Sequence, residues 1–241
     1  MTIEAETPYR RPISGDPVAR LPPARSPARA PIEGQLVSIE ALDPPRHAGE
    51  LHPASHASEE ARRIWEYLPW GPWATRGEFD AWLAQLAGSF EYVWYAFRTK
   101  SDGRANGMAC YLDIAPAHGV IEIGGIWFAP EMQRTRAATE TLFLLMSHAM
   151  DELGYRRLQW RCNALNEKSR NAARRLGHRF EGIFHNHMIV KGRNRDTAWY
   201  SITEAEWPEV RGLISAWLDD ANFDADGTAR RSLTAMMVDR E

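Results

Sequence analysis

One stretch of the chain, residues 120–153, restricts the possible folds more than any other. It begins with a dense run of β-branched and apolar residues at Val120–Phe128, is broken at Pro130, and continues with apolar residues that recur at helical spacing. Gly154 follows, where a left-handed residue ends many helices. The stretch therefore predicts a strand, a tight loop and a helix.

The predicted loop is suited to binding an anion. The first backbone amides of a helix have no partner within the helix, and the helix dipole is positive at that end. Here the loop also carries Gln133, Arg134 and Arg136. The alternative is that both arginines are solvated surface charges without a ligand. We expect the loop to hold a diphosphate.

The spacing Gln133-x-x-Arg136-x-Ala138 after a strand resembles the acetyl-CoA loop of the GNAT N-acetyltransferase superfamily. Within that superfamily the chain is most similar to the Rim-type branch, the ribosomal-protein N-terminal acetyltransferases. The resemblance implies that acetyl-CoA is the co-substrate. The residues it implies for cofactor binding are Ile126, Trp127, Phe128, Gln133, Arg134, Arg136, Ala137, Ala138, Thr139, Asn166 and Ser169.

Arg136 departs from the family pattern, which has glycine at this position of the loop. Glycine lets the backbone turn sharply and approach a phosphate closely. Arg136 brings a Cβ atom and an expected conformational cost. We expect its guanidinium to compensate by pairing with a phosphate, as arginine does with two parallel hydrogen bonds.

A second motif lies at Asn166-x-x-Ser169, ahead of a helical pattern that ends at Gly177. Asn166 fits either an N-cap or, as the resemblance implies, a partner of the pantetheine arm. Many relatives use a tyrosine of this helix to protonate the departing thiolate, and Ala173 stands at that position here. The Rim-type resemblance implies Ser169 as the acid; the alternative is an ordinary helix serine.

Three side chains are candidates for the catalytic base: Glu122, His185 and His187. Glu122 alternates with isoleucines on the predicted central strand. The two histidines are expected to share one face of a later strand, and imidazole titrates near neutral pH. The base carboxylate of Rim-type enzymes aligns near Met188, which cannot titrate. No metal is expected, because the histidine pair has no third ligand spaced nearby.

The resemblance implies an α/β GNAT fold, with a central mixed, mostly antiparallel sheet of about seven strands, flanked by helices and splayed at the acetyl-CoA site. Residues 1–34 contain seven prolines and predict a flexible arm. Residues 35–203 form the predicted acetyltransferase domain, and residues 204–241 a C-terminal helix and tail. The last two strands are expected to turn at Gly192–Asp196.

Tryptophans crowd the predicted helical region before the sheet, notably Trp65, Trp70 and Trp73. In GNAT folds the first two helices overhang the acceptor site. The resemblance therefore implies that these rings line the substrate wall. The alternative is that they belong to the hydrophobic core.

The net charge of −3 and the lack of a sustained basic face argue against a nucleic-acid partner. No apolar run reaches about 18 residues, so we expect no membrane association and a cytoplasmic location. Cys110 and Cys162 are expected to be buried thiols. The sequence leaves open whether the chain forms a homodimer.

The acceptor is expected to be a primary amine on a peptide or a small molecule. An α-amine, with a pKa of about 7.7–8.0, is far more often neutral at pH 7 than a lysine-type amine near about 10.4. A site without a strong base therefore favours a protein N-terminus or an amino-acid-like molecule. The alternatives are acetylation of a small metabolite, antibiotic or polyamine, and a non-catalytic acyl-CoA-binding regulator.

Overall fold

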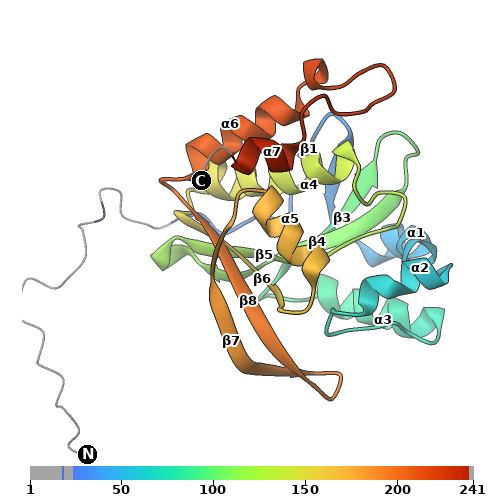
Figure 1. The fold of residues 1–241 in the computed structure, drawn as a ribbon. Helices are drawn as coiled ribbons and strands as arrows, with labels where there is room; N and C mark the ends of the chain where they lie inside the picture. The colour runs from blue at the N-terminus through green and yellow to red at the C-terminus, as the bar shows by residue number, and fades with distance from the viewer. Residues whose placement is uncertain (1–17, 19–23, 239–241) are drawn as a thin grey trace, which may run out of the picture.

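The computed structural model describes Val18 and residues 24–238. Their strands form one sheet in the order β1-β2-β3-β4-β5-β6-β8-β7, in which only β5 and β6 are parallel (Figure 1). The strands are β1 (Ile32–Glu33), β2 (Val37–Ala41), β3 (Val93–Thr99), β4 (Ala105–Ala115), β5 (Val120–Phe128), β6 (Arg157–Asn163), β7 (Arg179–Val190) and β8 (Arg193–Thr203).

Helices cover both faces of this sheet. They are α1 (Pro44–His56), α2 (Glu59–Arg62), α3 (Arg76–Ala87), α4 (Arg136–Ser147), α5 (Glu167–Arg175), α6 (Trp207–Leu218) and α7 (Leu233–Val238). Short helical turns are η1 (Arg63–Trp65), η2 (Pro116–His118), η3 (His148–Glu152) and η4 (Asp220–Asn222). The predicted α/β fold with a mostly antiparallel, helix-flanked sheet is confirmed.

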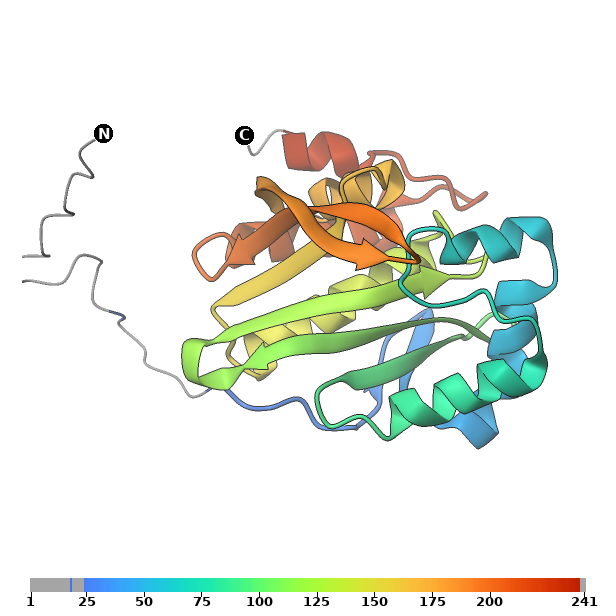
Figure 2. The ribbon, with the colours of Figure 1, turned by 90° about the horizontal axis from the view of Figure 1, so that it is seen from below.

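The two faces of the sheet carry separate cores. Ile121 and Ile123 of β5 pack with Leu142 and Leu145 of α4, on the face that α5–α7 also cover (Figure 1). Helices α1–α3 pack on the other face, against residues such as Leu112. Figure 2 shows these three helices at one end of that face, with the β7–β8 hairpin beside them. Alternation along β5 thus assigns each side chain to one of the two cores.

The predicted strand, loop and helix are confirmed. β5 spans Val120–Phe128, and the side chain of Thr135 caps α4 by accepting the N–H of Ala138 at 3.1 Å. The helix continues through the π-helical turn η3 and ends before Gly154, which has a φ of 81°. Local signals were sufficient for this unit because each of them acts within a few residues.

The flexible arm predicted for residues 1–34 is corrected for residues 24–34. Ala24 is buried, and the N–H of Arg25 donates to the carbonyl of Leu153 at 2.8 Å. The hydroxyl of Tyr95 donates to the carbonyl of Ala28 at 2.9 Å, and β1 adds a strand to the sheet. Prolines prevent a continuous ladder, but single hydrogen bonds still hold this segment. Residues 1–17 and 19–23 of the predicted arm lie outside the described residues.

The last hairpin turns one residue earlier than predicted and through a shorter connection. Val190 pairs with Arg193, so the connection is Lys191–Gly192, whose φ angles are 51° and 73°. Positive φ at both positions matches the twist of a two-residue hairpin. The amine of Lys191 donates to the carbonyl of Trp65 at 2.6 Å, which ties the hairpin tip to η1.

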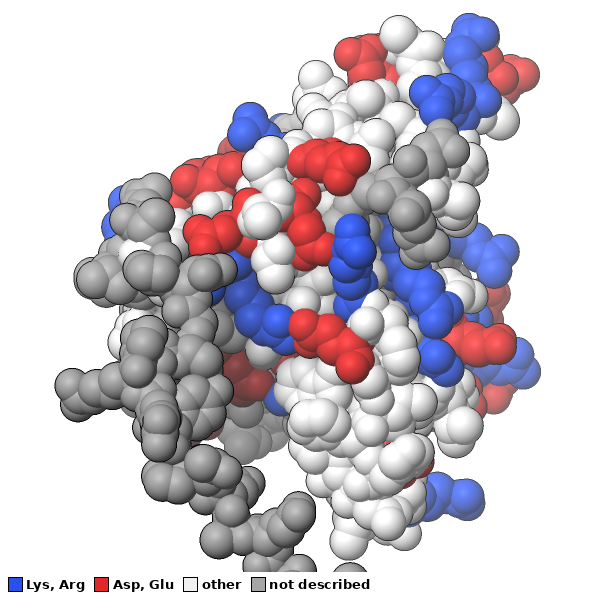
Figure 3. Space-filling view, turned by 60° about the vertical axis from the view of Figure 1, so that its left-hand side comes forward, with Lys and Arg blue, Asp and Glu red and all other residues white. Residues whose placement is uncertain are grey.

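Charges of both signs are mixed at the surface. Acidic and basic side chains lie next to each other on the face shown in Figure 3. Within residues 24–238, no helix has the length and apolarity needed to span a membrane.

Candidate active site

The sheet opens at its centre. β5 pairs with β6 only from Val120 to Glu122, opposite Arg157 to Gln159, although the two strands continue to Phe128 and Asn163. Beyond Glu122 the facing backbone edges of the strands are therefore not bonded to each other. An extended ligand with amide groups can add to such an edge through main-chain hydrogen bonds.

The loop at the end of β5 presents free donors beside this opening. The amides of Arg136 and Ala137 have no partner within the described part of the chain, as expected in the first turn of α4. Gln133 donates from its side chain to the carbonyl of Phe128 at 2.9 Å, which holds the loop against the strand. The loop therefore has the donors that an anion such as a diphosphate requires.

The two loop arginines differ from what we expected. Arg134, which is exposed, has a φ of 62°, whereas Arg136 is the first helical residue of α4 and has no left-handed φ. The conformational cost predicted for Arg136 therefore lies at Arg134. The guanidinium of Arg136 is bonded to Asp220 at 2.7 Å and to the carbonyl of Leu218, and lies 4.2 Å above the ring of Phe223. It holds the C-terminal segment, and the predicted pairing with a phosphate is not the arrangement observed.

Glu122 lies at the point where β5 and β6 separate, and its side chain is buried. One carboxylate oxygen is 3.3 Å from Nε of Arg161, and the other has no hydrogen-bond partner among the described residues. Burial raises the pKa of Glu122 to about 8, because the nearby Arg161 offsets only part of the loss of hydration. A carboxyl with this pKa exchanges protons near neutral pH.

The two candidate histidines do not share a face, contrary to the prediction. Asn186 has a φ of 51°, and the register of β7 shifts between Phe184 and Met188. Nδ1 of His185 lies 2.9 Å from Asp196, while Nδ1 of His187 lies 2.9 Å from Thr197. Neighbouring residues of a strand point to opposite faces, so the bulge directs the imidazoles to opposite sides.

Ser169 and Asn166 are organised around the N-terminus of α5. The side chain of Asn166 accepts the N–H of Ser169 at 3.1 Å, so Asn166 is the N-cap. The hydroxyl of Ser169 accepts from Nε1 of Trp160 at 3.0 Å. Burial raises the pKa of the Cys162 thiol, and a hydrogen bond with the Ser169 hydroxyl lowers that pKa by less, so the hydroxyl is placed to donate to sulfur. Trp160 belongs to the core on the α4 face, so Ser169 and Glu122 flank the opening from opposite sides.

The structure divides the three predicted wall tryptophans. Trp65 is 0% exposed, and its Nε1 donates to the carbonyl of Ser55 at 3.1 Å, so it is a core residue and cannot line a substrate wall. Trp70 and Trp73 are half-buried and remain candidates. The side chain of Trp127 is also in the core, so Trp127 could contact a cofactor only through its backbone. Sequence spacing carries no sign of this division, because it depends on how α1–α3 pack.

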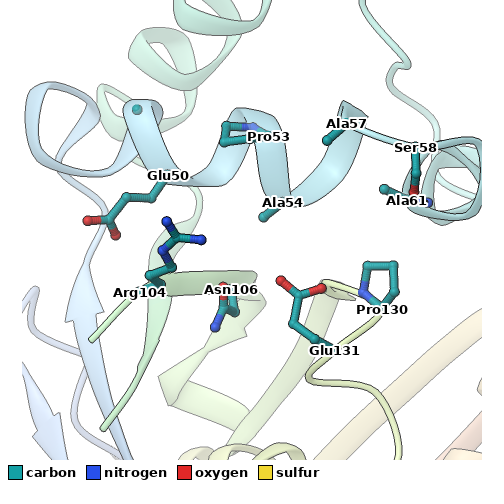
Figure 4. Close-up of a pocket in the computed structure, with 11 residues that line it drawn as sticks. Glu50, Pro53, Ala54, Ala57, Ser58, Ala61, Arg104, Asn106, Pro130 and Glu131 are labelled. Atoms are coloured by element: carbon teal, nitrogen blue, oxygen red, sulfur yellow. Dashed lines mark hydrogen bonds between the residues drawn. The ribbon is translucent and has the colours of Figure 1, made fainter. Parts of the chain in front are cut away.

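A cavity of about 400 Å³ lies away from the opening, between α1, the start of β4 and the end of β5 (Figure 4). Arg104 and Glu131 line it and point toward α1. It lies on the β4 side of β5, whereas the opening lies on the β6 side. The volume of this cavity therefore does not identify the catalytic site, because the buried carboxyl of Glu122 lies at the opening and does not line the cavity.

Sequence reasoning missed the groups that surround Glu122. Arg161 is bonded to Asp113 at 2.7 Å, and its guanidinium lies 5.2 Å from the ring of Trp199. Arg161 and Trp199 are directly opposed in the register of β6 and β8. The available signal was that Arg161 lies two residues after Gln159, and therefore on the same face, in the strand beside the central one. Within residues 24–238, no group of three or more His, Cys, Asp or Glu residues is arranged to hold a metal ion.

Comparisons with known proteins agree with this architecture. Residues 40–179 match the family model described as an acetyltransferase (GNAT) domain. A solved GCN5-related N-acetyltransferase from Brucella melitensis is 42% identical, with a TM-score of 0.88, over 92% of this chain and 100% of that one. A probable GNAT-family acetyltransferase from Chromobacterium violaceum ATCC 12472 is 40% identical, with a TM-score of 0.75, over 84% of this chain and 100% of that one.

A curated relative gives a narrower match. The Bacillus subtilis (strain 168) protein named "Putative ribosomal N-acetyltransferase YdaF" is 30% identical over 106 residues. Those residues are 44% of this chain and 57% of the relative. The matched segment therefore spans little more than half the length of the Bacillus protein.

Proposed function

We propose that this chain, which belongs to the GNAT family of acetyltransferases, transfers the acetyl group of acetyl-CoA to an α-amine. One observation carries the proposal: a buried carboxyl, Glu122, with a pKa of about 8, lies where the central strands separate. Acetyl-CoA would supply the activated acetyl group. This chain's residues would position the thioester and move the protons.

The open edge of β5 and the loop before α4 support a site for acetyl-CoA. The backbone of Ile126–Phe128 would pair with the pantetheine arm, and the free amides of Arg136 and Ala137 would meet the diphosphate. Thr135 and Ala138 already bond each other in the cap, so their role is to shape the turn.

In the transfer, the amine nitrogen bonds to the acetyl carbon, and the thioester C–S bond breaks with its electrons remaining on sulfur. The proton lost by the amine would pass to Glu122, directly or through water. Ser169, on the other side of the opening, would donate a proton to the departing sulfur. The amine would approach from the Glu122 side and the thioester from the Ser169 side. The two would therefore react directly, without a covalent enzyme intermediate.

The pKa of Glu122 supports an α-amine as the acceptor. Proton transfer is efficient when donor and acceptor have similar pKa values, and α-amines titrate at about 7.7–8.0. A lysine-type amine, near about 10.4, would lose its proton to this carboxyl less readily. The name of the Bacillus relative, a ribosomal N-acetyltransferase, is compatible with an α-amine on a protein.

A non-catalytic acyl-CoA-binding regulator is less well supported than it was from sequence. Two sequence features favoured it: the arginine at the glycine position of the loop, and the absence of the usual tyrosine from the second-motif helix. Arg136 adopts a helical conformation and its side chain turns toward Asp220, so it does not block the turn. What remains of the argument is Ala173 at the position of the usual tyrosine.

Release of free thiol from acetyl-CoA across a panel of α-amines and lysine-type amines tests the proposal. We expect release with α-amines, and a kcat lower by roughly 100-fold or more in Glu122→Gln. The exposed carboxylate of Glu91 provides a matched control, and Glu91→Gln should leave kcat unchanged. Binding of CoA without thiol release for any amine would favour the regulator, and an unchanged kcat in Glu122→Gln would remove Glu122 as the base.

A further inference from the structure

Arg195 on β8 is a buried cation without a partner. Its residue is 8% exposed, its Nε has no hydrogen-bond partner, and its side chain makes no ion pair within residues 24–238. The less buried arginines Arg98, Arg157 and Arg161 are all paired with carboxylates. Only Nε of Arg195 is a buried atom without a partner; the two terminal nitrogens reach the surface and make no ion pair with a described residue, so they are free to bind an anion.

The strand registers place Arg195 on the same face of the sheet as Glu122. Glu122 aligns with Gln159 on β6, and Arg161, two residues later on the same face, opposes Trp199 on β8. Arg195 lies four residues before Trp199 along β8, so strand alternation returns it to this face. Burial and the neighbouring Arg161 lower the pKa of Arg195, whereas the charge of Glu122 raises it, in agreement with this placement by register.

This face is not the one that receives the nucleotide in the proposed function. Helix α4, whose N-terminus would meet the diphosphate, packs on the opposite face against Ile121, Ile123 and Leu158. The ligand that can reach both Glu122 and Arg195 is therefore the acceptor. Glu122 and Arg195 are not bonded to each other, and each has a buried polar atom without a partner. They offer separate positions for an amine and an anion of one molecule.

We propose that Arg195 binds a carboxylate of the acceptor, and hence that the acceptor is an amine that also carries a carboxylate, as an amino acid does. This inference rests on the proposed function and narrows its substrate class. The planar guanidinium matches a carboxylate with two parallel hydrogen bonds. It would fix the acceptor while leaving its amine at Glu122.

The test uses pairs of α-amines that differ only at the carboxylate: L-alanine, glycyl-L-alanine and diglycyl-L-alanine, each with its C-terminal carboxamide, so that the distance from the amine to the carboxylate varies. Initial rates of thiol release are measured for the full-length wild type and for Arg195→Met, Arg195→Lys and the exposed control Arg193→Met. Calorimetry with CoA present measures binding of the same amines. The carboxamides have the less basic amines, so amine ionisation alone would favour them.

We expect the kcat/KM of the wild type to be roughly 10- to 100-fold higher for at least one acid than for its carboxamide. This ratio corresponds to the free energy that a hydrogen bond to a charged group contributes. Arg195→Met should abolish that preference without changing the KM for acetyl-CoA or the rate with carboxamides. Arg195→Lys should restore part of it, and Arg193→Met should behave as the wild type. Removal of an unpaired buried charge should not lower the Tm.

Three results would overturn the assignment of Arg195. One is equal use of acids and carboxamides by the wild type, which leaves the proposed acetyl transfer intact. Another is an equal loss with both members of each pair in Arg195→Met and Arg195→Lys. The third is an effect confined to the KM for acetyl-CoA, which would assign Arg195 to the nucleotide. If no amine is acetylated, the proposed function fails, and calorimetry still decides whether Arg195 selects acids.

Discussion

At the residue scale, the ionisation of Glu122 depends on its burial and on two charged neighbours, Arg161 and Asp113. Arg161 is shared between Asp113, at 2.7 Å, and Glu122, at 3.3 Å. Asp113 reaches Arg161 from a backbone with a φ of 47°, in a segment of β4 where the register with β5 shifts. The negative charge of Asp113 raises the pKa of Glu122 and so offsets part of the effect of Arg161. Burial therefore dominates at Glu122, and its pKa rises to about 8.

The raised pKa of Glu122 predicts how stability depends on pH. In the folded chain the carboxyl keeps its proton up to a pKa of about 8, whereas its ordinary value is 4.5. Its contribution to stability is therefore complete below pH 4.5 and is lost as the pH rises through about 8. The slope of this single-site contribution is roughly 1.4 kcal/mol per pH unit.

We expect Glu122→Gln, which cannot ionise, to lose this slope. Urea unfolding at about pH 5 and about pH 8 should show a smaller fall in the free energy of unfolding for the variant than for the wild type. Glu91→Gln is the control for a general effect of charge, because Glu91 is exposed. Parallel pH dependence in wild type and Glu122→Gln would contradict the raised pKa.

At the scale of elements, a carboxylate joins α4 to the first long strand. Glu140, which is 8% exposed, accepts the backbone N–H groups of Gln35, Leu36 and Val37 at 2.9, 2.7 and 3.1 Å. These amides belong to the turn between β1 and β2 and the start of β2. A helix pattern in the sequence gives no indication of this role, because the partners lie about a hundred residues away.

We predict that Glu140→Gln destabilises the fold by about 2–4 kcal/mol, since hydrogen bonds to charged groups contribute about 1.5–3 kcal/mol and the amide would bring its own N–H groups toward other donors. The denaturation midpoint in urea should fall with the m-value unchanged. Glu91→Gln provides the exposed comparison. A midpoint like that of the wild type would mean that the three amides are satisfied without Glu140.

At the scale of the whole molecule, both ends of the described chain brace the domain. Residues 24–34 lie against the end of η3 and against α3 and β3, through bonds such as Arg29 to the carbonyl of Ala87 at 3.0 Å. α7, in the segment predicted to be a tail, buries Leu233, Met236 and Met237 against the core. The domain core therefore includes segments outside residues 35–203.

A truncation tests this extension. A chain that begins at residue 35 should unfold at lower urea than one that begins at residue 24, by about 2–4 kcal/mol, because each lost hydrogen bond contributes roughly 0.5–1.5 kcal/mol and the hydroxyl of Tyr95 loses its partner. Tyr95→Phe in the longer chain should account for about 1 kcal/mol of this loss. Equal stability of the two truncations would show that the segment lies on the domain without supporting it.

The sequence by itself determined the features that depend on neighbours along the chain. The strand Val120–Phe128 and the helix after it are as predicted, and the C-terminal helix expected within residues 204–241 lies at Trp207–Leu218. A cap or a periodic apolar face needs only residues within a few positions, so its signal survives in the sequence. The ordered loop and helix motifs were also sufficient to predict the fold family, which the comparisons confirm.

Only the tertiary structure decided which charges and rings are available to a ligand. It buried Trp65, turned Arg136 toward Asp220, and left Arg195 without a partner. A bulge at Asn186 reversed the expected relation of the two histidines. Burial, pairing and strand register depend on residues far apart in the chain, and each changes the free energy of a charge or a polar group far more than local propensity does.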